Sequence, residues 1–525
     1  MKLSYEGILD RAPWQRAGIG LPGYDVRALH EATVREPRWV HFGIGNIFRI
    51  FIGGIADELI EAGLLDRGIT CVETFDGEIV DRIYRPYDDL TLAVTLYRDG
   101  TSEERVQGAL AEAVDATDPG PETMERLRQI FTAPTLQLVS FTITEKGYLP
   151  GGPEDPDKPR TAMGLLTGLL YERFRAGRGK LALVSMDNVS RNGEKLRNAV
   201  MDIAADWCAR GLAEEEFSAY LGDGGSVSFP WTMIDRITPR PSEDVRRALT
   251  DKGVEGMEIL VTRKHTYIAP YANAEGPRYL VIEDDFPNGR PPLERAGVYM
   301  TDRRTVDLSE RMKVTACLNP IHTALAPFDC MLGYVLFASG MSDPMLGRLA
   351  RLIGYGEGLP MVESPGILSP EAFLEEVLTE RFPNAALGDT SARIAVDISQ
   401  CIPFRFGETI RAWTARDGSA AGLRGIPLAI AGWIRYLLAV DDAGRPMELS
   451  PDPMIPELRE KLKDVRFGEP DSLGDALRPI LTDERIFRCD LYAVGLGGRI
   501  EAMVRRMLTG PGAVRAALEE YLREE

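Results

Sequence analysis

Apolar residues in the first half of the chain fall into short runs separated by helical patterns. The run WVHF at 39–42 predicts a buried strand that ends before Gly43 and Gly45, and ITCVE at 69–73 predicts the next strand. Apolar residues recur between them at helical spacing, at Ile50, Gly54, Ile55, Leu59 and Ile60. A strand, a glycine turn, a helix and a second strand predict the start of a dinucleotide-binding unit.

The same alternation continues downstream. Strands are expected at 136–144, 180–186 and 258–262, and helices at 161–175 and 193–210. Strands that alternate with helices favour a mostly parallel sheet.

A long loop rich in proline and glycine follows one of these strands, at 144–160. Open α/β sheets bind ligands where their strands end, so this loop is a candidate lid or substrate loop.

The second half of the chain is mainly helical in pattern. Helices are expected at 323–340, 343–355, 370–380, 421–440 and 511–523. We therefore predict an α/β Rossmann-type N-terminal domain at 1–290, which includes an N-terminal arm, and a mainly α-helical C-terminal domain at 291–525.

Length and charge narrow the class of protein. A chain of 525 residues is too long for one ordinary core. A formal net charge of −19 argues against nucleic acid or an anionic membrane as the main partner. A small anionic substrate remains compatible with this charge, because a local arginine or lysine can hold a carboxylate.

Cysteine and histidine placement argues against a disulfide framework or a metal site. The six cysteines include no CxxC pair, and the four histidines show no metal-ligand spacing. No apolar stretch has the length of a signal peptide or of a membrane helix. These features predict a cytoplasmic protein with no bound metal.

The glycine turn is the candidate cofactor site. Gly43 and Gly45 allow a tight turn whose backbone N–H groups approach phosphate oxygens, and Asn46 and Arg49 lie in the same segment. The third glycine of the usual GxGxxG pattern is replaced by Phe48. The alternative is an ordinary turn between a strand and a helix.

The second strand bears on the choice of cofactor. Glu73 ends this strand and Asp76 follows, and a carboxylate there can bind ribose hydroxyls and repel a 2′-phosphate. This pattern favours NAD over NADP. The alternative is that both residues only cap the turn.

The segment KVTACLNPIH at 313–322 carries candidate catalytic groups. A lysine among apolar residues can serve as a base near neutral pH, an asparagine can donate to a developing oxyanion, and a histidine can orient a hydroxyl. These groups are Lys313, Asn319 and His322. The alternative is a solvated lysine, a helix start and a core histidine.

Two further clusters contain polar side chains, and the first follows the expected strand at 180–186. Asn188 and Asn192 could donate to an oxyanion or could cap the next helix, which is the commoner role. Asp235 stands next to Arg236 and could contact substrate or serve only the structure.

Five segments, in this order, resemble the polyol-specific long-chain dehydrogenase/reductase family, which includes mannitol 2-dehydrogenases and hexuronate reductases. They are HFGIGNIFR, FTITEKGY, MDNVSRNG, FPWTMIDRITP and KVTACLNPIH, and NAALGDTSARIAVDISQCIPFRF at 384–406 also looks like the family. The resemblance implies a Rossmann-type domain, a largely helical C-terminal domain, a site between them and metal-independent hydride transfer.

The resemblance also implies roles for single residues. Lys313 would be the general acid/base, Asn319 with Asn192 or Asn188 would be the oxyanion donors, and His322 would bind substrate. Glu145 of the TEKGY segment would lie close to the proton path, and its neighbour Lys146 and Asp235 are further substrate candidates.

This chain departs from the family pattern at three places. The lysine usually stands five residues before the asparagine, whereas Lys313 stands six before Asn319; a bulged helix would still let it reach. The segment FHR is IFR here. The lysine that mannitol-type enzymes carry after the proline is replaced by Phe404, with Arg405 next to it, and this arginine could hold a carboxylate in bidentate fashion.

The last departure favours a sugar-acid substrate. The hypothesis is an NAD-dependent reductase that interconverts D-fructuronate and D-mannonate, as a monomer or weak homo-oligomer. The alternatives are a mannitol or arabinitol 2-dehydrogenase, or a tagaturonate reductase, with the same machinery. A non-catalytic nucleotide sensor is a further alternative, which the combination of lysine, asparagine and histidine disfavours.

Overall fold

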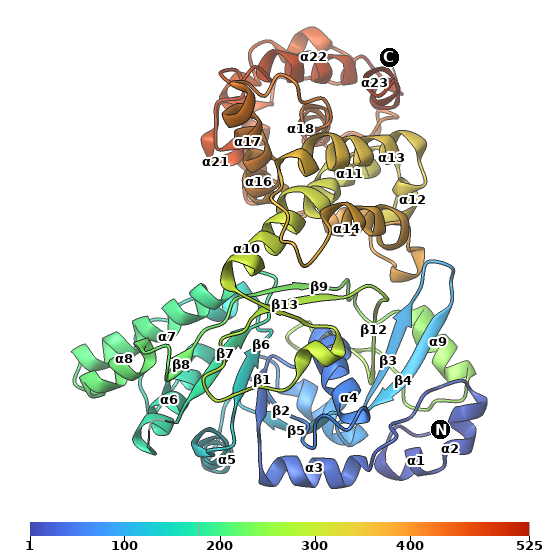
Figure 1. Cartoon of the computed structure of the whole chain (residues 1–525). Coiled ribbons are helices and arrows are strands. Elements are labelled where there is room, and N and C mark those ends of the chain that lie inside the picture. The colour runs from blue at the N-terminus through green and yellow to red at the C-terminus, as the bar shows by residue number, and fades with distance from the viewer. Residues whose placement is uncertain (178, 524–525) are drawn as a thin grey trace. The chain divides into compact units, whose positions relative to one another are not determined.

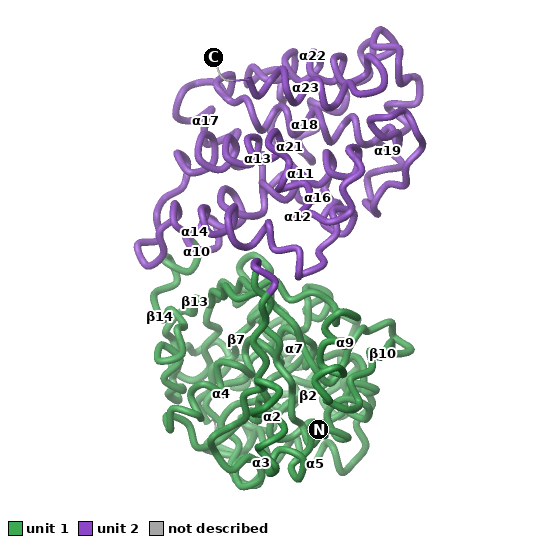
Figure 2. The backbone as a smooth tube through the Cα atoms, turned by 90° about the vertical axis from the view of Figure 1, so that its right-hand side faces the viewer, with its two compact units in different colours: residues 1–97, 101–307 green, residues 98–100, 308–525 purple. Residues whose placement is uncertain are grey.

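The computed structural model describes residues 1–177 and 179–523, and the chain forms two compact units (Figures 1 and 2). Unit 1 consists of Met1–Tyr97 and Thr101–Asp307, and unit 2 of Arg98–Gly100 with the chain from Leu308 onward. No helix among the described residues is long and apolar enough to cross a bilayer.

A six-stranded parallel sheet forms the centre of unit 1, in the order β5-β2-β1-β6-β7-β8. Its strands are β1 (Trp39–Phe42), β2 (Ile69–Glu73), β5 (Leu110–Asp115), β6 (Leu138–Phe141), β7 (Leu181–Ser185) and β8 (Val227–Ser228). Numbered within this sheet alone, the order is 3-2-1-4-5-6, the order of dinucleotide-binding folds. Strands up to β5 are added on one side of β1 and strands from β6 on its other side, and ligands of such sheets bind at this switch point, beyond the carboxyl ends of the strands.

Both faces of the sheet are buried, which explains why its strands are apolar runs without polar alternation. Val40 and Phe42 point into one core with Leu183, whereas Trp39 and Val184 point into the other. Helices of unit 1 cover the two faces, as Figure 1 shows. The helices that contribute to the two cores are α3 (Val26–Arg35), α4 (Gly53–Glu61), α5 (Pro121–Thr132), α6 (Ala162–Arg175), α7 (Asn192–Ala209) and α8 (Glu215–Gly222). Unit 1 also contains α1 (Tyr5–Leu9), α2 (Arg11–Arg16) and α9 (Glu243–Asp251).

Smaller sheets account for the remaining strands of unit 1. One has the order β12-β3-β4 and another β14-β13-β9, and β10 pairs with β11 as an antiparallel hairpin. Their bounds are β3 (Thr91–Leu96), β4 (Ser102–Gln107), β9 (Thr232–Asp235), β10 (Leu260–Val261), β11 (Tyr267–Ile268), β12 (Tyr271–Glu275), β13 (Tyr279–Glu283) and β14 (Tyr299–Thr301). The expected strand at 258–262 is therefore wrong as a member of the main sheet, because only two of its residues pair, and they pair in the hairpin.

Unit 2 is helical in all the elements that the structure describes from Leu308 onward, apart from isolated bridges. Helix α10 (Arg303–Met312) leads into it from unit 1 and runs into the π-helix η6 (Lys313–Cys317). The other α-helices are α11 (Asn319–Leu332), α12 (Phe337–Met341), α13 (Pro344–Arg351), α14 (Pro370–Glu376), α15 (Ser391–Ile394), α16 (Ile398–Ile402), α17 (Glu408–Asp417), α18 (Gly425–Tyr436), α19 (Ile455–Lys461), α20 (Arg478–Leu481), α21 (Glu484–Phe487), α22 (Gly497–Met507) and α23 (Ala513–Tyr521). Further π-helices are η7 (Leu352–Gly358), η9 (Val377–Arg381) and η11 (Pro403–Gly407).

Helices α11 and α18 form the centre of unit 2. Every residue of α18 is buried, which suits a helix that is apolar on all sides before its last residues Arg435 and Tyr436. A Cβ at Gly432 would lie 2.3 Å from the ring of Phe328, so a glycine allows the two helices to cross closely. The buried carboxylate of Glu357 accepts hydrogen bonds from the backbone N–H groups of Gly425 (2.6 Å) and Ile426 (2.8 Å), and so caps α18.

Candidate active site

The glycine turn lies at the switch point in the strand order of the main sheet, next to the ends of β1 and β6. Gly43 follows β1 with φ +86°, and a Cβ there would lie 2.2 Å from the carbonyl oxygen of Thr142, just past β6. Only glycine fits this close approach of the two strand ends. A Cβ at Gly45 would meet no atom within 4 Å, so the backbone there has open space beside it. The turn leads through the π-helix η1 (Phe48–Ile52) into α4.

Arg49 points away from the turn and into the protein. Its side chain is fully buried, and its guanidinium donates to the hydroxyl of Thr91 (3.1 Å) and the carbonyl of Ala269 (2.7 Å). Burial lowers its pKa. These bonds hold η1 against the neighbouring strands, and a contact of Arg49 with the cofactor stays a prediction. Asn46 stays at the turn, where its amide donates to the carbonyl of Tyr267 (3.2 Å).

The two carboxylates after β2 are both buried. Glu73 accepts from the backbone N–H groups of Phe75 (2.7 Å) and Asp76 (3.1 Å), and its second oxygen lies 3.3 Å from the N–H of Ile44 in the glycine turn. Burial raises its pKa. Asp76 accepts from the hydroxyl of Thr262 (2.6 Å). Glu73 therefore connects the end of β2 to the glycine turn and to the residues that follow β2. Asp76 connects the same residues to Thr262.

An exposed aromatic residue lies at the same rim. The side chain of Phe75 is 61% exposed, and the Lys264 ammonium lies 4.8 Å from its ring centroid and donates to its carbonyl. Sequence inspection missed this pair, because Lys264 follows β10 far along the chain.

Asp187 holds the start of the 144–160 loop. One carboxylate oxygen accepts from the N–H of Thr144 (2.8 Å), and the other accepts from the N–H of Ile143 (3.1 Å) and the hydroxyl of Tyr148 (2.6 Å). Thr144 has φ +64°, a strained conformation for a β-branched residue. The bonds from Asp187 therefore fix the backbone that carries Glu145.

The two candidate asparagines differ in their surroundings. Asn192 is 1% exposed, and its amide nitrogen donates to the carbonyl oxygens of Asp187 (3.0 Å) and Thr232 (3.0 Å) and to the Thr232 hydroxyl (2.9 Å). Its oxygen accepts from the N–H groups of Thr232 and Gly193. An amide engaged in this way has no donor left for substrate. Asn188 is exposed, directly after the carbonyl that Asn192 holds.

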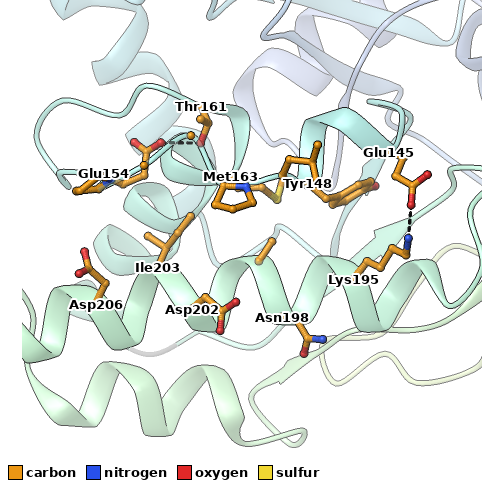
Figure 3. A pocket seen from close by; sticks show the side chains of 16 residues that line it. Glu145, Tyr148, Glu154, Thr161, Met163, Lys195, Asn198, Asp202, Ile203 and Asp206 are labelled. Atoms are coloured by element: carbon orange, nitrogen blue, oxygen red, sulfur yellow. Dashed lines mark hydrogen bonds and ion pairs between the residues drawn. The ribbon is translucent and has the colours of Figure 1, made fainter. Parts of the chain in front are cut away.

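A cavity of about 500 Å³ lies between the 144–160 loop and α7 (Figure 3). Glu145 and Lys195 form an ion pair at one end of it, and Glu154 accepts from the hydroxyl of Thr161 (2.8 Å) at the other. Lys146 is exposed on the same short 3-10 turn as Glu145. Hydrogen bonds to Asp187 therefore anchor the start of the loop, and hydrogen bonds to Glu154 anchor a later part of it.

Asp235 ends β9, where it is half-buried and in register with Tyr279 of β13. Its neighbour Arg236 donates to the carbonyls of Glu275 (3.0 Å) and Ile50 (3.0 Å). The arginine is therefore structural, and the aspartate remains a substrate candidate.

The segment 313–322 lies in unit 2 as a helix with a π-turn at its start. Lys313 is 1% exposed, and the N–H of Leu318 donates to its carbonyl (3.2 Å), five residues back. Asn319 and His322 lie one helical turn apart at the start of α11, and both are half-buried. The His322 ring stacks on Phe382 (4.3 Å between centroids) and meets Phe337 edge-on (4.9 Å), which fixes its orientation.

Arg405 points towards the same helix. It donates to the hydroxyl of Thr323 (2.6 Å), which follows Asn319 by four residues on the same face of α11. Burial lowers the pKa of Arg405, and no carboxylate among residues 1–177 and 179–523 forms an ion pair with it. Phe404 turns outward, 49% exposed, with the guanidinium of Arg488 over its ring.

Metal-ligating side chains do not gather in this region. In the part of the chain that the structure describes, no group of three or more histidine, cysteine or acidic residues is placed to hold a metal ion.

Family models match both units. The model of the mannitol dehydrogenase Rossmann domain matches residues 37–295, and that of the mannitol dehydrogenase C-terminal domain matches residues 305–491. The chain belongs to the mannitol dehydrogenase family.

Its relatives within the family differ in substrate. The D-mannonate oxidoreductase of Thermotoga maritima is 49% identical, with 100% of both chains covered. Mannitol 2-dehydrogenase from Pseudomonas fluorescens, in a ternary complex with NAD and D-mannitol, is 26% identical, with 100% of both chains covered and a TM-score of 0.75. A D-sorbitol dehydrogenase in substrate-free form is also 26% identical, with 96% of this chain and 98% of that chain covered and a TM-score of 0.77.

In this member of the mannitol dehydrogenase family, some residues that hold the candidate site residues in place were not predicted from the sequence. Thr323 accepts a hydrogen bond from Arg405, and Tyr148, the last residue of the TEKGY segment, donates one to Asp187. Only the spacing of Thr323 from Asn319, one helical turn, could have signalled its role.

Proposed function

We propose that this protein is an NAD-dependent oxidoreductase that interconverts D-fructuronate and D-mannonate. Identity of 49% over the full length to a protein named D-mannonate oxidoreductase supports this, against 26% for the mannitol and sorbitol enzymes. The observation that carries the proposal is Arg405, a largely desolvated guanidinium with no carboxylate partner among the described residues.

The position of Arg405 suits a sugar acid. Its guanidinium bonds to Thr323, about 6 Å along α11 from Asn319, since four residues rise by that distance. In fructuronate three carbon atoms separate the ketone from the carboxylate, a similar length. The ketone oxygen near Asn319 would therefore leave the carboxylate within reach of Arg405. Arginine binds carboxylates through two parallel hydrogen bonds.

The glycine turn fits a nicotinamide dinucleotide. The strand order, the close approach at Gly43 and the open space at Gly45 leave backbone exposed where such folds bind a pyrophosphate. The acids Glu73 and Asp76 after β2 place carboxylates where a 2′-phosphate would be repelled, which supports NAD over NADP. The dinucleotide, when bound, supplies the hydride for reduction and accepts it in oxidation.

The residues of the chain then manage the proton and the developing charge. Lys313 donates a proton to the alkoxide oxygen during reduction and takes it back in oxidation. The amides of Asn188 and Asn319 stabilise the alkoxide, and His322, held by its two aromatic neighbours, orients the substrate. Glu145 would serve the proton path, and Lys146 and Asp235 remain candidates for contact with the sugar.

Oxidation of NADH and of NADPH should be measured with D-fructuronate, D-tagaturonate and D-fructose in parallel. The expected result is the highest kcat/KM with NADH and D-fructuronate. Preference for D-tagaturonate would keep the carboxylate argument but change the epimer. Preference for D-fructose would make the protein a polyol dehydrogenase, and no oxidation with any sugar would favour a nucleotide sensor.

The two asparagines should separate in mutagenesis. Asn188→Ala is expected to lower kcat by about 100-fold, as loss of an oxyanion donor does, without changing the melting temperature. Asn192→Ala leaves buried backbone groups of Thr232 and Asp187 without partners, so it should lower the free energy of unfolding by about 2–4 kcal/mol. Steady-state kinetics and thermal unfolding of both variants test this, and the reverse pattern would make Asn192 the oxyanion donor.

A further inference from the structure

The π-helix η6 contains one residue more than an α-helical turn. Lys313 and Asn319 are six residues apart, one more than the spacing that the family resemblance implies. The bond from the N–H of Leu318 to the carbonyl of Lys313 spans five residues, as in a π-turn. A π-turn absorbs one inserted residue, so the helix before it and the helix after it keep their facing.

The hydroxyl of Thr409 supports this turn from a neighbouring helix. Thr409 is 3% exposed in the first turn of α17, and its hydroxyl donates to the carbonyl of Thr315 in the middle of η6 (3.1 Å). Other helical threonines donate to the carbonyl four residues back in their own helix, namely Thr33, Thr132, Thr167, Thr250, Thr315, Thr379, Thr414 and Thr482. Thr409 instead bonds to another element, at a carbonyl within the irregular turn.

A glycine gives the turn its space. Gly358 of η7 packs against η6, and a Cβ there would lie 2.9 Å from the Cβ and 3.0 Å from the Cα of Ala316. Such distances are shorter than van der Waals contact, so a larger residue would push on the turn. Two neighbouring elements therefore accommodate the irregular backbone of η6: α17 through the Thr409 hydroxyl and η7 through the space at Gly358.

We propose that Thr409 is a positioning residue, whose hydrogen bond holds the π-turn that keeps Lys313 in register with Asn319 for proton transfer. The inference rests on the proposed role of Lys313 as acid/base. It goes further because it explains how this chain tolerates the extra residue between the two groups. Gly358 provides the room in which the turn forms.

The test compares Thr409→Val, Thr409→Ala and Thr409→Ser with Lys313→Ala, in the full-length protein and with NADH and D-fructuronate. Thr414→Val is the matched control, because Thr414 lies on the same helix but donates to the carbonyl of Ile410 (2.8 Å) within it. Each variant is measured for kcat, KM for NADH, the solvent deuterium isotope effect on kcat and the melting temperature.

Loss of the hydroxyl is expected to lower kcat by roughly 10- to 100-fold, as small misplacements of a reacting group do. The KM for NADH should stay unchanged, and the solvent isotope effect should rise because proton transfer becomes slower. Thr409→Ser should restore near-normal values, and Thr414→Val should not differ from the wild type. If Thr409→Val does not fold, the same measurements on Thr409→Ala, which adds no bulk, test the proposal.

Two outcomes overturn the inference in different ways. If Thr409→Val and Thr409→Ala melt earlier but keep normal kcat and isotope effect, Thr409 is only structural. If Lys313→Ala retains normal turnover, the proposed acid/base role fails and the positioning role fails with it. An inactive Lys313→Ala beside fully active Thr409 variants would reject the positioning role alone.

Discussion

Replacing Lys313 by alanine is expected to lower kcat for D-fructuronate reduction by roughly 1,000-fold, within the range that general acid–base catalysis contributes. The side chain is 1% exposed in a π-turn that precedes Asn319 and His322, and it is the group that the proposed mechanism assigns to proton transfer. The affinity for NADH should not change, because the backbone N–H groups proposed to bind the pyrophosphate belong to the glycine turn and not to the Lys313 side chain. Steady-state kinetics and NADH fluorescence titration measure the two effects separately.

Lys463→Ala is the matched control for this variant. Lys463 is an exposed lysine of unit 2 whose ammonium bonds to Glu460 (2.6 Å). It should behave as the wild type in both measurements. Near-normal turnover of Lys313→Ala with intact NADH binding would remove Lys313 as the acid/base. Partial recovery of activity with added primary amines would support it.

Replacing Arg405 by alanine should lower kcat/KM for D-fructuronate by roughly 100-fold, which corresponds to loss of about 2–3 kcal/mol from charged hydrogen bonds. Arg405 is a largely desolvated guanidinium bonded to Thr323, with no ion pair in the described part of the chain. The kcat/KM for D-fructose should change by less than about threefold, because fructose has no carboxylate that Arg405 could bind. Arg405→Lys should recover only part of the activity, since lysine cannot form the bidentate contact.

The ratio of the kcat/KM values for D-fructuronate and D-fructose decides this prediction. Arg411→Ala serves as the control, because Arg411 is exposed on α17 and pairs only loosely with Glu408 (3.5 Å). It should leave both sugars unaffected. Equal losses for fructuronate and fructose with Arg405→Ala would show that this arginine supports the fold or a shared step, and the carboxylate argument would fail.

Local pattern was a good guide to the central sheet. The strands at β1, β2 and β7 and the helices α6 and α7 lie where runs and helical spacing placed them, because strands buried on both faces need apolar residues throughout. The strand β5 was missed: its residues LAEAVD include two acids, and it borders the sheet at an edge. The hairpin of β10 and β11 was misplaced, because pairing partners are chosen by contacts far along the chain.

Residue types near the site could be named from the chain, but their roles could not. Asn188 and Asn192 could not be distinguished from the sequence. In the structure Asn188 is exposed, whereas the side-chain amide of Asn192 is hydrogen-bonded to Asp187 and Thr232. Arg49 stands in the candidate cofactor segment of the sequence, and its side chain is buried against Thr91 and Ala269. Apart from Asp187, the hydrogen-bond partners in these cases are 40 or more residues away along the chain, so residue spacing does not predict them.

The sequence by itself determined the Rossmann-type order of the first half, the helical second half and the five segments that resemble the family, because apolar periodicity and short motifs are local properties. Tertiary structure alone decided that the extra residue before Asn319 becomes a π-turn, held by Thr409 of α17 and by the space at Gly358. It also decided that Arg405 points to Thr323 while Phe404 faces outward. These outcomes depend on packing between distant segments, where hydrogen bonds and excluded volume select one backbone path among several that the local sequence allows.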